Sequence, residues 1–271
     1  MHSDISIKSK IKKYDVYFEN NLKKIINQNY NDNDVILIDN KVYKKFDKNN
    51  LIKKKVIKLS INERAKEYYQ IGNIINKLIN INFSKKNKLI VIGGGITQDI
   101  SSFISHIIFR GVDWIYVPTT LLSQADSCIG SKISINFKKY KNLIGNYNPP
   151  TKIYICENFL KTIQKKDILS GIGEMLHYFI ISSNKDLNNF NKNIDNFINL
   201  NNNIVNQYIK ICLNIKKKFI EKDEFDNKER IFLNYGHTFG HAIESIENYK
   251  IPHGISVCYG IDIVNYISYK L

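Results

Sequence analysis

The sequence predicts an α/β protein whose N-terminal part is an open, mostly parallel, Rossmann-like sheet and whose C-terminal part is all helical. Three observations support this prediction. Short apolar runs, typical of buried parallel strands, alternate with helical segments in the first half of the chain. Three consecutive glycines, Gly93 to Gly95, follow one such run directly. From about Asp167 onward the strand signal disappears and only helical periodicity remains.

Four strands and two helices are predicted in the N-terminal part. The strands comprise residues 35–39, 89–92, 114–117 and 152–155. The helices comprise residues 61–81, where apolar residues recur at helical spacing, and 96–109. Alternation of strands and helices is typical of an open parallel sheet with covering helices.

The C-terminal part is predicted to form helices over residues 168–182, 187–221 and 230–248. The Asn-rich stretch 184–203 keeps its apolar residues at helical spacing, which favours an amphipathic helix over a disordered linker. The apolar pattern of 257–267 reaches Leu271 without a capping signal, as expected for a helix cut off or barely completed.

The length of 271 residues exceeds the roughly 100–200 typical of one domain, so we expect two. We place the α/β domain at 1–162 and the helical domain at 163–271. The four cysteines form no CxxC pair, which indicates a reducing compartment. The N-terminus has no apolar signal region, and no run approaches the roughly 18 apolar residues of a membrane span. These features predict a soluble, cytoplasmic protein that does not bind membranes.

The net charge of +15 raises the possibility of nucleic-acid binding. The lysines are spread along the chain instead of being concentrated in one patch, and the chain is rich in Asn, Ile and Lys throughout. We therefore expect no nucleic-acid partner. The same charge is compatible with a basic site for an anionic small molecule.

Three of the six histidines fall in one window, at His237, His241 and His253. His237 and His241 are four residues apart and would project from the same face of a helix. Two imidazoles at this spacing can close on one divalent metal, or one can bind metal while its neighbour handles protons. The alternative is a set of core or capping histidines, which the clustering of three makes less probable.

Two further segments carry residues suited to anionic ligands. In Gly93 to Gly95 the backbone N–H groups could approach a diphosphate at the start of a helix, although the spacing is not GxGxxG. Thr119 and Thr120 could add hydroxyl donors at the same sheet edge. Lysines and an Asn among small residues in 126–132 and 141–145 suit a phosphate or carboxylate. Structural glycines and solvated loop lysines are the alternatives.

Glu174 and His177 stand at i and i+3 in a predicted helix, a spacing that metal-carboxylate sites use. Glu174 lies in an otherwise apolar segment, where an unpaired charge would be costly.

Taken in order, these motifs resemble the 3-dehydroquinate synthase family of sugar phosphate cyclases over nearly the whole chain. The matching segments are Gly93 to Gly95 with Asp99, Arg110-Gly111, 118–122, 126–132, 141–145, Gly173-Glu174, 234–244 and His253-Gly254. Each segment is a weak signal by itself, but their order is specific.

The resemblance implies a role for each matching residue. NAD-binding residues would be Asp39, Glu63, Lys66, Gly94, Gly95, Asp99, Thr119, Thr120, Lys141 and Thr162. The ligands of one divalent metal, zinc or alternatively cobalt, would be Glu174, His237 and His253. Substrate-binding and catalytic residues would be Arg110, Asp126, Lys132, Asn142, His177, Lys216, Arg230, Asn234 and His241. His241 would handle protons and not bind the metal.

The family reaction converts 3-deoxy-arabino-heptulosonate 7-phosphate to 3-dehydroquinate and phosphate, a step of the shikimate pathway to the aromatic amino acids. NAD removes a hydride from C5 and thereby acidifies the neighbouring C–H. Phosphate then leaves, the hydride returns, the ring opens and an aldol reaction closes the carbocycle. The resemblance also implies a homodimer acting on an anionic sugar phosphate.

The chain departs from the family at His177, where a substrate-contacting Lys is usual. We hypothesise that His177 still hydrogen-bonds substrate; altered substrate preference, an extra contact near the metal and reduced activity are all open. Lys216 and Arg230 are both present, which favours a carboxylated substrate over sedoheptulose 7-phosphate. Family members continue for several more helices after the His-Gly motif, so we expect the helical domain to be incomplete.

Three alternatives remain open at this point. The chain could be another sugar phosphate cyclase, of the sedoheptulose 7-phosphate type, or a relative of the iron-type alcohol dehydrogenases. From a different class, it could be an inactive, truncated protein that binds NAD or metal.

Overall fold

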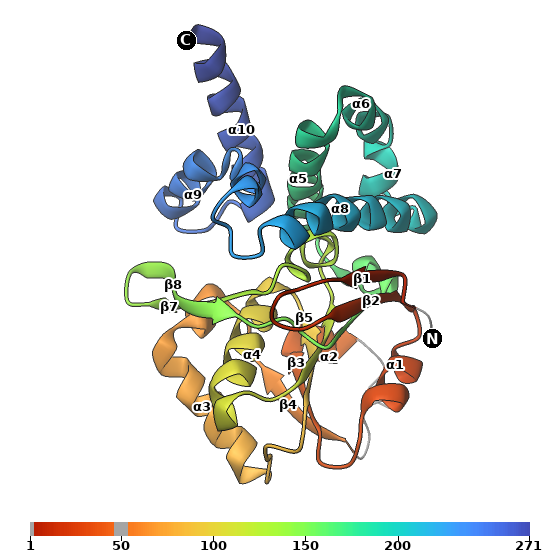
Figure 1. Cartoon of the computed structure of the whole chain (residues 1–271), viewed down its shortest axis with the longest axis vertical. Helices are drawn as coiled ribbons and strands as arrows, with labels where there is room; N and C mark the ends of the chain where they lie inside the picture. Colours follow the sequence, from red (N-terminus) through yellow and green to blue (C-terminus); the bar gives the residue numbers. More distant parts are fainter. Residues whose placement is uncertain (1–2, 46–53) are drawn as a thin grey trace. The chain divides into compact units, whose positions relative to one another are not determined.

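The computed structural model describes residues 3–45 and 54–271 and divides into two compact units. The first unit comprises Met1–Thr119 and Ser131–Asn158, and the second comprises Thr120–Gly130 and Phe159–Leu271. Figure 1 follows the chain in colour through these segments. The predicted fold class, a mostly parallel α/β sheet followed by helices, is confirmed. The domain boundary at residue 162 stays a prediction.

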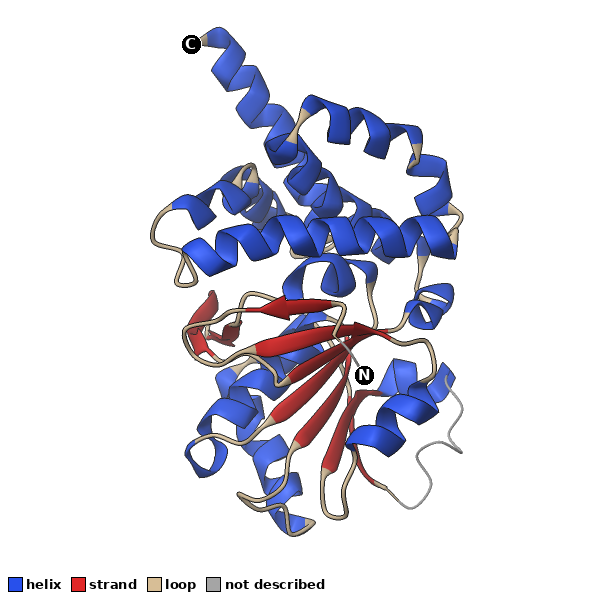
Figure 2. Cartoon of the chain, turned by 45° about the vertical axis from the view of Figure 1, so that its right-hand side comes forward, coloured by secondary structure: helices blue, strands red, loops and turns tan. Residues whose placement is uncertain are grey.

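The first unit contains a seven-stranded sheet in the order β1-β2-β9-β6-β5-β3-β4, drawn in red in Figure 2. Its strands are β1 (Ile5–Ile7), β2 (Tyr14–Phe18), β3 (Val35–Asp39), β4 (Lys55–Leu59), β5 (Leu89–Gly93), β6 (Trp114–Pro118) and β9 (Lys152–Ile155). Among the described strands of this sheet, only the β1–β2 pair is antiparallel. The four strands predicted from apolar runs, β3, β5, β6 and β9, are confirmed.

Strands β5 and β6 are buried along their whole length, as continuous apolar runs in a parallel sheet should be. The helices of this unit are α1 (Leu22–Asn29), α2 (Asn40–Lys45), α3 (Tyr68–Asn80) and α4 (Gly95–Ile107), with short turns η2 (Glu63–Lys66) and η3 (Ile108–Arg110). The predicted helix 61–81 therefore begins late, because its first turn is the separate turn η2. The predicted helix 96–109 corresponds to α4.

The order of the strands creates a reversal point between β3 and β5. Strand β4 pairs with one side of β3, whereas β5, β6 and β9 extend from its other side. In open α/β sheets, ligands bind outside the carboxyl ends of the strands at such a point. A separate hairpin of β7 (Lys132–Phe137) and β8 (Tyr140–Tyr147) completes the strands of this unit.

The second unit is helical throughout, as predicted for the chain after Asp167. Its helices are α5 (Lys165–Ser182), α6 (Asn184–Lys192), α7 (Ile194–Ile198), α8 (Asn202–Lys222), α9 (His237–Ile246) and α10 (His253–Lys270). Short helical segments η4 (Ser123–Ser127), η5 (Glu157–Thr162) and η6 (Glu229–Asn234) precede some of them. The first two residues of η5, Glu157 and Asn158, belong to the first unit.

Two of the predicted helices are interrupted. The segment 187–221 is helical, as predicted, but it is divided among three helices, α6, α7 and α8, with Leu200 in a left-handed conformation at φ 52° between α7 and α8. The segment 230–248 forms η6 and α9, separated by Gly236 at φ 79°. The Asn-rich stretch is helical, as predicted, and buries Phe190 and Phe197.

Glycines let α10 lie directly against α5 and α9 (Figure 1). A Cβ atom on Gly254 would lie 1.8 Å from the carbonyl oxygen of Ser170, and one on Gly173 would lie 2.3 Å from that of Gly254. A Cβ atom on Gly260 would similarly lie 2.0 Å from the carbonyl oxygen of Gly236. These contacts need glycine, and they bring the first turn of α10 next to Glu174.

Helix α10 is apolar on its packed side, where Val257 and Ile261 are buried. Later in the helix, Tyr266 and Ile267 are exposed. Among the residues that the structure describes, no helix is both long and apolar enough to span a membrane.

Candidate metal centre and cofactor edge

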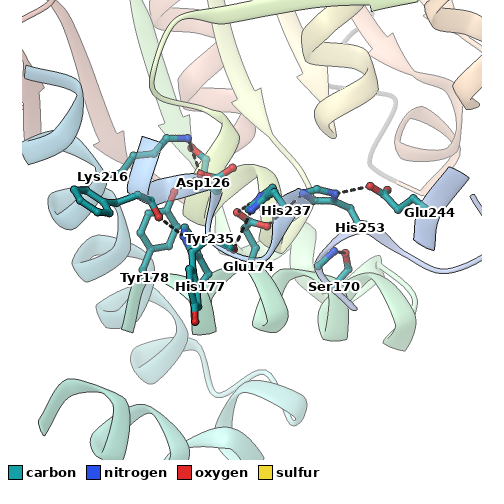
Figure 3. A network of polar contacts seen from close by, with 12 residues as sticks. Asp126, Ser170, Glu174, His177, Tyr178, Lys216, Tyr235, His237, Glu244 and His253 are labelled. Atoms are coloured by element: carbon teal, nitrogen blue, oxygen red, sulfur yellow. Dashed lines mark hydrogen bonds and ion pairs between the residues drawn. The ribbon is translucent and has the colours of Figure 1, made fainter. Parts of the chain in front are cut away.

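Three potential metal ligands converge in the second unit from three different helices (Figure 3). Glu174 comes from α5, His237 from α9 and His253 from α10, and one ligand atom of each lies within 4.8 Å of the others. His237 Nε2 is 3.8 Å from Glu174 Oε1, and His253 Nε2 is 3.5 Å from Glu174 Oε2. One carboxylate thus faces two imidazole nitrogens.

The local sequence explains this convergence. His237 and His253 are each the first residue of a helix, after the left-handed Gly236 and after Pro252 respectively. Proline before a helix and glycine at a sharp turn both fix where the helix begins. Glu174 follows Gly173, the residue on which α10 packs, so the close crossing of the two helices places it beside His253.

The charges in this cluster favour an additional cation. Glu174 is buried, and its Oε2 atom has no hydrogen-bond partner among the described residues. Burial alone would raise the pKa of Glu174, but interactions with His253 and His237 hold that pKa below its usual value. Burial alone would lower the pKa of His253, but Glu174 and Glu244 raise it to about 10. A buried carboxylate with an unpartnered oxygen beside two imidazoles is a donor set that suits a zinc-like ion.

His241 follows His237 by one turn of α9, and the two ring centroids are 5.4 Å apart. It belongs to a second possible ligand group, with Glu244 and His253, whose ligand atoms also lie within 4.8 Å of one another. The structure therefore associates His237 with Glu174, and His241 with Glu244. The predicted metal and proton-handling roles of these residues stay predictions.

Glu244 was not assigned a role from the sequence. Its Oε2 atom lies 3.0 Å from His253 Nδ1, and its side chain is buried. Glu244 follows His237 by seven residues, so both project from one face of α9. The seven-residue spacing is visible in the sequence. The pairing of Glu244 with His253 is not.

His177 is fully buried on α5, three residues after Glu174. Its Nε2 atom is 3.3 Å from the carbonyl oxygen of Phe232 in η6, and its Nδ1 atom has no hydrogen-bond partner in the described residues. The ring lies edge-on to His237, with centroids 5.6 Å apart. Burial lowers the pKa of His177, so this imidazole is neutral near pH 7.

Asp126 is held by two side chains on the same oxygen. Lys216 Nζ lies 2.6 Å from Asp126 Oδ1 and 2.9 Å from the carbonyl oxygen of Asp126. The hydroxyl of Tyr178 donates to the same Oδ1 atom (Figure 3). Sequence reasoning missed Tyr178, because an aromatic residue on an apolar helix gives no separate signal.

Arg230 is also tied to the protein. Its guanidinium donates to the carbonyl oxygens of Glu224 and of Gly130, the latter at 2.9 Å. Its own N–H donates to Asp223, which also accepts from the N–H groups of Asn227 and Lys228. Asn234 is exposed at the end of η6.

The first unit gathers several predicted cofactor residues near the hairpin. Lys66 Nζ lies 2.7 Å from Asp99 Oδ2 and 2.6 Å from Asn142 Oδ1. Asn136 connects the cluster further, because it donates to Glu63 Oε1 and accepts from the N–H of Asn142. Burial raises the pKa of Asp99, and Lys66 opposes that rise.

Other predicted cofactor residues lie at the carboxyl ends of neighbouring strands. Asp39 ends β3, Gly94 and Gly95 follow β5, and Thr119 follows β6. Among the described residues, no side chain caps the start of α4, and a Cβ atom on Gly95 would have nothing within 4 Å. Free space and uncapped N–H groups at the β3–β5 reversal suit a diphosphate.

The remaining predicted residues are divided between the two units. Thr120 and Thr162 belong to the second unit and bond locally, to Ser123 Oγ and the carbonyl oxygen of Phe159. Arg110, Lys132 and Lys141 are exposed in the first unit.

Several solved enzymes share this fold. A 2-epi-5-epi-valiolone synthase from Streptomyces hygroscopicus subsp. jinggangensis 5008, solved with NAD+ and Zn2+, has a TM-score of 0.82 at 18% identity, covering 95% of this chain and 74% of its own. A 2-deoxy-scyllo-inosose synthase, solved with carbaglucose-6-phosphate, NAD+ and Co2+, has a TM-score of 0.80 at 20% identity, covering 97% and 76%. An iron-containing alcohol dehydrogenase reaches 0.66 at 14% identity, covering 90% and 74%. The fold is therefore that of the sugar phosphate cyclases.

Comparison of the sequence with protein families identifies one family within this class. Residues 56–170 match the N-terminal domain of 3-dehydroquinate synthase, and residues 171–271 match its C-terminal domain. The chain is 33% identical over 273 residues to the 3-dehydroquinate synthase of Dictyoglomus thermophilum, covering 99% of this chain and 77% of that protein. It therefore belongs to the 3-dehydroquinate synthase family, and the predicted resemblance is confirmed.

The share of each relative that is matched varies. The enzyme of Buchnera aphidicola subsp. Cinara cedri is 38% identical over 249 residues, which are 89% of this chain and 68% of that protein. A bifunctional 3-dehydroquinate synthase/phosphatase of Fusobacterium nucleatum is 36% identical over 258 residues, which are 91% of this chain but 39% of that protein.

Proposed function

We propose that this chain catalyses the conversion of 3-deoxy-arabino-heptulosonate 7-phosphate to 3-dehydroquinate and phosphate, with NAD and one divalent metal ion. The observation that carries the proposal is the convergence of Glu174, His237 and His253, in which one oxygen of Glu174 has no hydrogen-bond partner among the described residues. The names of the relatives support the reaction, and the bound groups in two structures of the same fold support the cofactors.

Glu174, His237 and His253 would hold the metal ion, with zinc as the first expectation and cobalt as the alternative. When bound, the ion would supply a Lewis acid that lowers the pKa of a coordinated substrate hydroxyl. The chain itself provides the oriented ligands, because each of the three side chains is fixed by the start or the crossing of a helix.

NAD would lie at the carboxyl ends of β3, β5 and β6, where it would serve as acceptor and donor of one hydride. Asp39 would hydrogen-bond a ribose hydroxyl, and the N–H groups of Gly95 and the following turn would meet the diphosphate. Thr119 and Thr120 would add hydroxyl donors. The Lys66–Asp99 pair with Glu63 and Lys141 would bind other parts of the same cofactor. Thr162, which matches the family pattern, would contact it as well.

Proton transfer and substrate binding would fall mainly to the second unit. His241 is exposed beside His237 and could move a proton close to the metal. Asp126, oriented through one oxygen by Lys216 and Tyr178, could accept a substrate hydroxyl with its other oxygen. Asn234 of this unit would contribute a further hydrogen bond. Arg110, Lys132 and Asn142 stay predicted substrate-binding residues of the first unit.

Lys216 and Arg230 would bind the substrate carboxylate, as predicted, in addition to the protein oxygens that they already contact. Both cations are already bonded to protein oxygens, Lys216 to Asp126 and Arg230 to two carbonyl groups. An ammonium has three donors and a guanidinium five, so each retains donors for an anion. His177 would offer the substrate a neutral imidazole where the family pattern has a lysine.

A coupled assay of phosphate release and NADH absorbance tests the proposal. With 3-deoxy-arabino-heptulosonate 7-phosphate, NAD and Zn2+, we expect phosphate release without net NADH. Steady accumulation of NADH would instead identify a dehydrogenase.

Release from sedoheptulose 7-phosphate alone would identify another cyclase. No release from either substrate would reject the enzymatic proposal for this chain and favour an inactive binding protein. A homodimer and a place in aromatic amino acid biosynthesis stay predictions that accompany the proposed reaction.

A further inference from the structure

His253 belongs to both groups of possible metal ligands in the second unit. One group joins it to Glu174 and His237, and the other joins it to Glu244 and His241. The two nitrogens of its ring face different carboxylates. Nε2 lies 3.5 Å from Glu174 Oε2, and Nδ1 lies 3.0 Å from Glu244 Oε2.

The two distances indicate different interactions at the two nitrogens of the His253 ring. At 3.0 Å, the Nδ1–Glu244 contact has the length of a regular hydrogen bond, in which Nδ1–H donates to the carboxylate. At 3.5 Å, Nε2 and Glu174 Oε2 are farther apart than a regular hydrogen bond, and that oxygen has no other partner in the described residues. A cation between them would satisfy both atoms.

We infer that Glu244 is a positioning residue of the metal centre, which holds the Nδ1–H of His253 so that the Nε2 lone pair faces the ion beside Glu174. The inference rests on the proposed function for the metal site itself. An imidazole can present only one nitrogen to an ion while the other donates a hydrogen bond. Glu244 therefore serves the Glu174–His237–His253 group, and the His241–Glu244–His253 group is not a second metal site.

The position of Glu244 on α9 supports this role. It stands two helical turns after His237, so one face of α9 provides both a ligand and the support of another ligand. Glu244 is buried, where a carboxylate is costly unless it accepts hydrogen bonds. Carboxylates that accept from a ligating histidine fix its ring and raise its basicity, and their loss typically costs about 10–100-fold in metal affinity.

The test is zinc affinity of the metal-free protein, measured without substrate by competition with a chromophoric chelator. We expect Glu244→Ala to raise the zinc Kd about 10–100-fold. Glu244→Gln should weaken binding less, because the amide oxygen still accepts from Nδ1–H. The matched control is Glu247→Gln, at an exposed Glu that follows the same helix, with an expected change below about twofold.

Two further variants distinguish the ligand groups. Glu174→Ala should abolish zinc binding, whereas His241→Ala should change the Kd by less than about twofold. Circular dichroism of each metal-free variant checks folding. The absorption spectrum of the Co2+-loaded protein should change in Glu244→Ala and be restored towards the wild type in Glu244→Gln, which a purely structural role of Glu244 would not produce.

An unchanged zinc Kd in Glu244→Ala would overturn the inference. So would loss of binding in His241→Ala with retention in Glu174→Ala, because the ion would then lie in the other group. A wild-type protein that binds no zinc would also overturn it. Zinc binding in the expected pattern without phosphate release would reject the proposed reaction and leave the role of Glu244 supported.

Discussion

Lys216, a predicted substrate-binding residue of the second unit, also forms a buried ion pair that should stabilise the fold. Its ammonium is largely buried and bonds both the carboxylate and the carbonyl oxygen of Asp126. Removing one partner of a buried ion pair leaves the other charge uncompensated, which typically costs about 3–5 kcal/mol. The chain offers a neighbouring comparison, because Lys217 makes a more exposed contact of 3.8 Å with Glu221.

We therefore predict that Lys216→Met lowers the free energy of unfolding by about 3 kcal/mol. Lys217→Met should change it by less than about 1 kcal/mol, as for other surface ion pairs. Urea unfolding followed by circular dichroism measures both values. Equal effects of the two substitutions would show that the Asp126–Lys216 pair does not stabilise this unit.

The crossing of α5 and α10 depends on glycine, and so does the position of Glu174 beside His253. A methyl group at Gly254 would collide with the backbone of Ser170, which cannot move as a flexible side chain could. Gly72 in α3 is the opposite case, because a Cβ atom there would have no atom of the described residues within 4 Å.

Gly254→Ala should therefore destabilise the protein by about 3 kcal/mol or more, since overpacking against backbone forces the helices apart. It should also weaken zinc binding. Gly72→Ala should be neutral or stabilise by up to about 1 kcal/mol, because alanine is the better helix former. Thermal unfolding and zinc titration of both variants measure these effects. A stable Gly254→Ala protein with normal zinc affinity would show that the close crossing of α5 and α10 does not require glycine at this position.

Asp223 organises the segment that leads into η6. Burial alone would raise its pKa, but three backbone N–H groups, those of Asn227, Lys228 and Arg230, hold the pKa of Asp223 below its ordinary value. A carboxylate with a lowered pKa in the folded state stabilises the fold above its unfolded pKa of about 3.9. That stabilisation disappears as the pH falls through the folded pKa.

The stability difference between wild type and Asp223→Asn should consequently be full at pH 7 and shrink below about pH 4. Urea midpoints at a series of pH values measure it. The exposed Asp262→Asn is the control and should show no such difference. A difference that is equally large at pH 3 and pH 7 would mean that Asp223 stabilises the segment without its charge.

These elements also explain what could be predicted from the sequence. Strands β3, β5 and β6 were predicted because burial on both faces leaves a continuous apolar run. Strand β8 was missed because it is mostly exposed and gives no alternation. The breaks between α6, α7 and α8 were missed because the Asn-rich stretch carries no proline or glycine to mark them.

In the candidate site, too, some features could be predicted from the sequence and others could not. The predicted ligands came from the order of the motifs, and the structure brings Glu174, His237 and His253 together. The contact of Glu244 with His253 could not be predicted, because it depends on how closely α9 and α10 pack at Gly236 and Gly260. Spacing within a helix is visible in a sequence, whereas the distance between two helices is not.

In the molecule as a whole, the candidate metal ligands and the strand-end cofactor residues belong to separate compact units. Binding of zinc and binding of NAD should therefore respond to different substitutions. Asp39, at the carboxyl end of β3, is the sharpest probe of the cofactor edge. Asp113 is its control, because it precedes β6 in the parallel sheet and so lies at the opposite edge, exposed beside Lys12.

We predict that Asp39→Ala raises the Kd for NAD about 10–100-fold, since a hydrogen bond to a charged group is worth about 1.5–3 kcal/mol. Asp113→Ala should leave NAD binding unchanged, and neither substitution should alter the zinc Kd. Isothermal titration with NAD and chelator competition for zinc measure the two affinities independently. If Asp39→Ala weakened zinc binding as strongly as NAD binding, Asp39 would not act on NAD binding alone, and its assignment to the cofactor edge of the first unit would have to be abandoned.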